Sequence, residues 1–111
     1  MYAYDQQDSS IKHKLTRYDA SSKGDTDQFE WPYDGIKVFI RGSFDNWTSS
    51  IPLQRRDSDG VHEVILLFRR GEGYSYKYVV DKIWKYRMDK ETKVDAHGNV
   101  NNFLDLRYVR R

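Results

Sequence analysis

The chain has 111 residues, of which 19 are basic and 17 acidic, and it contains no cysteine. This length supports one small domain, and the even charge argues against obligatory binding of nucleic acid, although the end of the chain, residues 107–111, is locally basic. Without cysteine there is neither a disulfide framework nor a cysteine-zinc site. No signal peptide or membrane-length apolar run is present, so we expect a cytoplasmic protein without a membrane partner.

The first segment, residues 1–28, is rich in Ser, Asp, Gln and Lys. Its few apolar residues offset too little of the entropy that ordering would remove. We therefore predict a polar N-terminal arm over residues 1–28, disordered alone or ordered by a partner. A β-sandwich domain over residues 29–107 and a basic tail over residues 108–111 complete the predicted organisation. We expect a larger protein complex to contact the arm and the tail.

From Phe29 onward, short alternating segments are separated by turn-forming residues. The predicted strands cover residues 36–41, 51–54, 61–68, 74–80, 83–86 and 100–106. The run 61–68 is the most apolar and is expected to be central, whereas Pro52 favours an edge strand. A polar loop is expected over residues 87–99. Six or seven short strands without a helix predict an all-β, antiparallel β-sandwich.

Two tryptophans and a lysine stand out among these strands. Trp47 follows Asp45-Asn46 in a loop, Trp84 follows a tight turn, and Lys77 lies on the polar side of an alternating strand. A sugar ring has an apolar face that stacks on indole and hydroxyls that accept hydrogen bonds from a long donor. From the residues alone, core packing remains open for Trp47 and is favoured for Trp84, and Lys77 could be an ordinary solvated side chain.

Several motifs in fixed order resemble the glycogen-binding module of the AMP-activated protein kinase β subunits, in carbohydrate-binding module family 48. They are Gly42-Ser43-Phe44-Asp45-Asn46-Trp47, Ile51-Pro52-Leu53, Gly71-Glu72-Gly73, Tyr76-Lys77-Tyr78-Val79-Val80-Asp81, Trp84, and Gly98-Asn99-Val100-Asn101-Asn102. The resemblance runs from about Phe29 to Leu106. It implies an immunoglobulin-like β-sandwich that binds α-1,4-linked glucans such as glycogen or starch.

The resemblance also implies a set of carbohydrate-binding residues: Trp47, Lys77, Trp84, His97, Asn99 and Asn101. The two tryptophans match the stacking residues, and Lys77 and Asn101 match residues that bind sugar hydroxyls. His97 and Asn99 stand where the kinase subunits have leucine and threonine, and Lys82 replaces the glycine usual in the turn before Trp84. No cofactor and no metal are expected.

Other functions have weaker support. Asp57, Asp59, Glu63 and Asp81 could include a glycosidase pair, but all except Glu63 lie in turns where aspartate has a structural use. Residues 73–78 are similar to the aromatic strand of an RNA-recognition motif, yet Glu72 takes the place of a basic residue and the required helices are absent.

We therefore predict a non-catalytic module that binds α-glucan and targets a partner or assembly to it. Because the residues end at Arg111, directly after the motifs, we expect a stand-alone module rather than a complete kinase scaffold. The alternative is a structural docking subunit that uses the same sandwich with a degenerate sugar site. Binding of nucleic acid is not expected.

Overall fold

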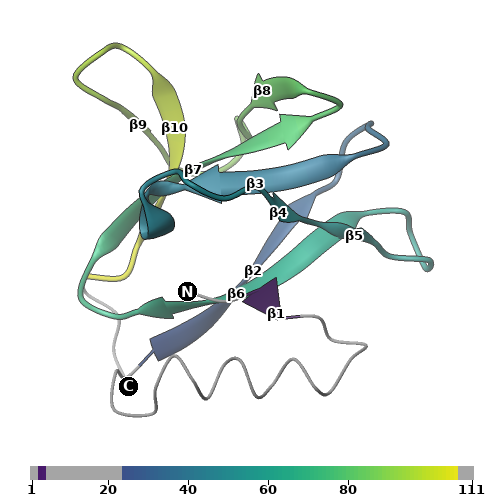
Figure 1. Cartoon of the computed structure of the whole chain (residues 1–111), viewed down its shortest axis with the longest axis horizontal. Coiled ribbons are helices and arrows are strands. Elements are labelled where there is room, and N and C mark those ends of the chain that lie inside the picture. Colours follow the sequence, from purple (N-terminus) through teal and green to yellow (C-terminus); the bar gives the residue numbers. More distant parts are fainter. Residues whose placement is uncertain (1–2, 5–23, 108–111) are drawn as a thin grey trace.

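The computed structural model describes residues 3–4 and 24–107, which form two antiparallel sheets packed face to face (Figure 1). The only helical element in this described part is one 3₁₀ turn, η3 (Ser43–Asp45). The predicted all-β antiparallel sandwich is confirmed. Among the same residues, no helix has the length and apolar character needed to cross a bilayer.

The first sheet is built around β6 (His62–Arg69), the apolar run that the sequence predicted to be central. Along one edge it pairs with β2 (Gly24–Trp31) over its whole length. Its other partners are the two-residue strands β1 (Ala3–Tyr4) and β5 (Gln54–Arg55). Every second residue of β6 is buried, as alternation on a sheet with one covered face requires.

The second sheet has the order β4-β3-β7-β10-β9, with β8 as a further partner of β7. Its strands are β3 (Val38–Gly42), β4 (Ile51–Pro52), β7 (Gly73–Val80), β8 (Ile83–Lys85), β9 (Thr92–Val94) and β10 (Val100–Asp105). Strand β3 pairs with residues 76–80 of β7, whereas β10 pairs with residues 73–76 and β8 with residues 78–80. Strands β10 and β8 therefore follow one another along the edge of β7 opposite β3.

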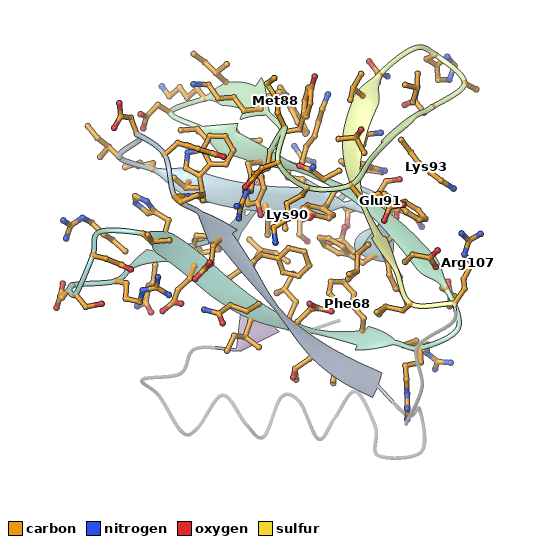
Figure 2. The ribbon with its side chains drawn as sticks, turned by 180° about the vertical axis from the view of Figure 1, so that it is seen from behind. Phe68, Met88, Lys90, Glu91, Lys93 and Arg107 are labelled. Atoms are coloured by element: carbon orange, nitrogen blue, oxygen red, sulfur yellow. The ribbon has the colours of Figure 1, made fainter. Side chains whose placement is uncertain are left out.

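The core lies between the two sheets and is rich in aromatic rings. Tyr74, Tyr76 and Tyr78 of β7 all point into it, and Figure 2 shows Phe68 of β6 between the two layers. The rings of Phe68 and Tyr74 lie 4.9 Å apart between centroids. Burial raises the pKa of Tyr76 to about 12 and raises that of Tyr78 further. Because successive strand residues alternate, the residues between these tyrosines face away from the core.

Trp31, at the end of β2, belongs to this core. Its side chain is buried, its ring lies 5.0 Å from that of Tyr78, and its indole N–H donates a hydrogen bond of 3.1 Å to the carbonyl oxygen of Asp34. A buried indole with its polar group satisfied is a structural element of the fold.

The boundary expected between residues 28 and 29 falls inside β2, which begins at Gly24. Main-chain pairing with β6 continues over Thr26 and Gln28, whose exposed side chains give no apolar signal. Asp27 is partly buried there, and desolvation raises its pKa. Apart from β1, the remaining residues of the predicted arm, 1–2 and 5–23, and the tail 108–111 lie outside the described residues, so their roles stay predictions.

Two other details differ from the sequence pattern. The predicted polar loop over residues 87–99 contains β9, whose three side chains are all exposed and therefore lack an alternating pattern. Ile36, the first residue of the strand predicted over residues 36–41, precedes β3 and is 82% exposed. Its main-chain N–H donates to the carboxylate of Asp81, which holds the segment outside the strand.

Candidate functional site

A groove of about 660 Å³ opens on the outer face of the second sheet. It is lined by Ser43, Trp47, Ser75, Lys77, Trp84, Asp95, Asn99 and Asn101. These side chains share a face because β7 turns its tyrosines inward, and Trp84 is the cross-strand partner of outward-facing Val79. Of the six carbohydrate-binding residues that the motif resemblance implied, all except His97 line this groove.

The two tryptophans lie next to each other at the groove. Their ring centroids are 6.4 Å apart and their planes are inclined by 52°. Trp84 is 49% exposed and Trp47 is partly buried, so neither belongs to the hydrophobic core. Core packing, favoured for Trp84 by local alternation alone, is wrong, because β8 presents that residue on the outer side of the sheet.

The turn after β3 places Trp47 over the sheet. Asn46 and Trp47 both have left-handed backbones, with φ of 59° and 63°, and the N–H of Trp47 donates to the carbonyl oxygen of Gly42 at 2.9 Å. A β-carbon at Gly42 would lie 2.7 Å from the carbonyl oxygen of Ser75, so only glycine lets the turn pack this closely on β7. A left-handed backbone is rare and strained for a bulky residue such as tryptophan, and strained residues of this kind are often found at functional sites.

A two-residue turn between β7 and β8 places Trp84. Asp81 and Lys82 both have positive φ, 49° and 73°, the conformation that such hairpins prefer. The Asp81 carboxylate accepts main-chain hydrogen bonds from Lys37 and Ile36, which lower its pKa. Lys82, at the position where the motif resemblance leads us to expect glycine, has a left-handed backbone that is sterically unfavourable for a residue with a side chain.

The far wall of the groove is a turn organised by Asp95. Its carboxylate accepts hydrogen bonds from the main-chain N–H groups of His97 at 2.8 Å and Asn99 at 2.9 Å, and from the Asn99 side chain at 3.1 Å. These bonds, with those from Asn99 first, lower the pKa of Asp95. The turn fixes Asn99 in the groove wall. His97 is exposed in the same turn and is not among the lining residues.

The floor of the groove is polar. Lys77 and Ser75 project from β7, and Asn101, which is 7% exposed, projects from β10 opposite Lys93. The main-chain N–H of Ser75 donates a hydrogen bond of 2.9 Å to the hydroxyl oxygen of Ser43. Ammonium, amide and hydroxyl groups beside aromatic faces can bind a neutral, polyhydroxylated ligand. Asp95, Ser43 and Ser75 were not predicted from the sequence; only Asp95, an acid at the start of a turn that contains Gly98 and Asn99, had a recognisable signal.

Three of the four acids considered for a glycosidase pair, Asp59, Glu63 and Asp81, make structural contacts. Arg56 binds Asp59 at 2.7 Å and Glu63 at 2.7 Å, and its hydrogen bond lowers the pKa of Asp59 to about 2. Asp81 is engaged by main-chain N–H groups. In the part of the chain that the structure describes, no three His, Asp or Glu side chains gather in a way that could hold a metal ion.

Residues 26–109 match a protein family described as the glycogen recognition site of AMP-activated protein kinase. The chain belongs to this family. The match covers more than half of the chain and includes every residue of the groove, and it confirms the resemblance drawn from the motifs.

Individual relatives agree with this assignment. The human 5'-AMP-activated protein kinase subunit beta-2 is 35% identical over 77 residues, which are 69% of this chain and 27% of that protein. The SNF1-related protein kinase regulatory subunit beta-1 of Arabidopsis thaliana is 38% identical over 76 residues, 68% of this chain and 26% of the relative. The pig subunit beta-1 sequence is 33% identical over 88 residues, 79% of this chain and 69% of that sequence. The chain thus spans about a quarter of the length of the first two relatives.

Proposed function

We propose that this family member is a non-catalytic module that binds α-1,4-linked glucan of the glycogen or starch type. The observation that carries the proposal is the pair of inclined indoles, 6.4 Å apart, at a groove with a polar floor. Two flat apolar faces at an angle suit successive rings of a curved sugar chain, whereas a single flat platform suits one ring. The family's described role in glycogen recognition supports the same ligand class.

In this proposal Trp47 and Trp84 stack on sugar rings, and Lys77, Asn99 and Asn101 bind hydroxyls. His97 approaches the ligand from the Asp95 turn. Each stacked ring contributes on the order of 1–3 kcal/mol from the apolar area it covers. After the cost of association, a short oligosaccharide binds with a dissociation constant of roughly micromolar to millimolar. A polymer that offers many sites raises the apparent affinity.

An NMR titration with maltoheptaose tests the proposal. We expect the indole N–H signals of Trp47 and Trp84 to shift together, while that of buried Trp31 stays in place. Cellohexaose, which has the same sugar but β-linkages, is the matched control and should cause much smaller shifts. No shift of either signal at millimolar maltoheptaose would contradict glucan binding.

We also propose that the module brings a larger assembly to the glucan, because its relatives are named as kinase subunits. The contacts to that assembly are predicted for residues 1–28 and 108–111, and a cytoplasmic location remains part of the same prediction. Sedimentation of the native assembly with glycogen, using the parent chain and the variant Trp84→Ala, tests this idea. Loss of the partners from the glycogen pellet with the variant is expected. Partners that pellet equally with both chains would favour the docking subunit with a degenerate sugar site.

A further inference from the structure

Arg41, on the outer face of β3, contacts both tryptophans although it does not line the groove. One of its guanidinium N–H groups, at Nη2, donates a hydrogen bond to the carbonyl oxygen of Trp47. Its Cζ atom lies 5.4 Å from the ring centroid of Trp84, within the range of a cation–π interaction. One planar side chain therefore joins a residue of the β3 turn to a residue of β8, across β7.

The position of Arg41 is electrostatically unfavourable. It is the direct cross-strand partner of Lys77, and like charges in that position destabilise a sheet. Among the described residues no carboxylate forms an ion pair with Arg41, and its Nε atom is buried without a hydrogen-bond partner. Such unfavourable features are expected where a residue serves a site rather than the fold.

The turns that carry the two tryptophans fix their backbones, and Arg41 adds one contact to each residue. Trp47 has a strained left-handed backbone, and a hydrogen bond to its carbonyl oxygen favours that conformation. Trp84 lies on a three-residue strand whose side chains are all exposed. The guanidinium over its ring restrains the indole, which is half exposed and therefore accessible to a ligand. A guanidinium can make both contacts at once, whereas the ammonium of lysine is a point charge without the planar fork.

We propose that Arg41 is a positioning residue that holds the rings of Trp47 and Trp84 at the mutual angle that a glucan requires. This inference rests on the proposed function, since it concerns the same site. Arg41 acts through the tryptophans and need not touch the sugar. Restraining both indoles before binding increases affinity because less freedom is lost in the complex.

The variant Arg41→Lys tests this inference, because it keeps the positive charge but replaces the planar guanidinium by an ammonium group that cannot make both contacts at once. We expect its affinity for maltoheptaose to fall about threefold to tenfold. In the unliganded variant the indole N–H signals of Trp47 and Trp84 should both move, while that of Trp31 should stay, because Trp31 is held in the core by its bond to Asp34. Arg55→Lys, at an exposed arginine of β5 on the other sheet, is the matched control and should change none of these quantities.

Three results would overturn the inference. The first is unchanged affinity in Arg41→Lys. The second is a loss of affinity with unmoved signals of Trp47 and Trp84, which would make Arg41 a direct sugar contact. The third is a shift of Trp31 alongside the other two with a large fall in melting temperature, which would make Arg41 a general structural residue. If the parent chain itself does not bind maltoheptaose, the proposed function fails, and the free-state indole signals still decide whether Arg41 orients the two rings.

Discussion

The two faces of β7 are built in different ways. Toward the core, its tyrosines pack against aromatic neighbours in ordinary extended backbone, and toward the groove it presents Ser75, Lys77 and Val79. Within the described residues, the non-glycine residues with positive φ are Asn46, Trp47, Asp81 and Lys82. They are Trp47 itself, the residue before it, and the turn that leads to Trp84. Among the described residues, the strained non-glycine backbones therefore lie in the two turns beside the groove, and these turns position the rings of Trp47 and Trp84.

The largest expected effect comes from the core face. Tyr78→Ala removes a fully buried ring, and we expect it to lower the free energy of unfolding by about 3–5 kcal/mol. Its neighbour provides the contrast. Lys77→Ala, one residue away on the groove face, should change unfolding by less than about 0.5 kcal/mol while weakening sugar binding. Denaturant unfolding of both variants measures the difference, and equal losses of stability would contradict the division between the faces.

The next largest effect concerns the groove face. Trp84→Ala should cost about 1–3 kcal/mol of maltoheptaose affinity, because it removes one stacking surface. Its unfolding should remain cooperative with little change in midpoint, since the indole is half exposed and outside the core. Calorimetric titration and thermal unfolding of the same sample separate the two quantities. A variant that no longer unfolds cooperatively would make Trp84 a structural residue.

The sequence predicted the layers well and the site only in part. Alternation and turn chemistry were sufficient for β3, β6 and β7, because each has one buried face. Alternation says which residues share a face but not which face is covered, so Trp84 alone suggested core packing. The motif resemblance, and not the local pattern, identified the tryptophans as partners. Strand β9 and the first half of β2 were missed because exposed polar side chains can form a strand through main-chain bonds alone.

Arg41 shows a further limit of sequence reasoning. An arginine at an outward position of an alternating strand is ordinary, and nothing in its neighbourhood along the chain indicates a contact with Trp84, 43 positions later. The register between β3, β7 and β8 creates that contact. The same limit applies to the Asp95 turn. The sequence of a short polar loop does not indicate which part of the sheet the loop will lie next to. Tertiary pairing, which depends on the whole chain, determines both.

A smaller effect, of opposite sign, tests the strain itself. Lys82→Gly should raise the free energy of unfolding by about 0.5–1 kcal/mol, because glycine adopts φ near 73° without steric strain. We expect this relief of strain to exceed the cost of ordering glycine, which has more conformational freedom in the unfolded chain. Lys85→Gly, three residues later in the extended strand β8, is the matched control and should be destabilising. Sugar affinity should stay unchanged in Lys82→Gly. A loss of stability in both variants would show that the turn is not strained.

The smallest expected effect is the response of the Asp95 turn to acid. Hydrogen bonds from Asn99 and His97 hold the folded-state pKa of Asp95 below its usual value of about 3.9. The stabilisation from this carboxylate is therefore complete above the unfolded-state pKa and is lost as the pH falls through the lower folded-state pKa. We expect the main-chain amide signals of His97 and Asn99 to titrate together in that acidic range. They should not do so in Asp95→Asn, which keeps an oxygen acceptor but has no proton to gain. If the signals titrate unchanged in that variant, another group controls the turn, and the groove wall is not organised by Asp95.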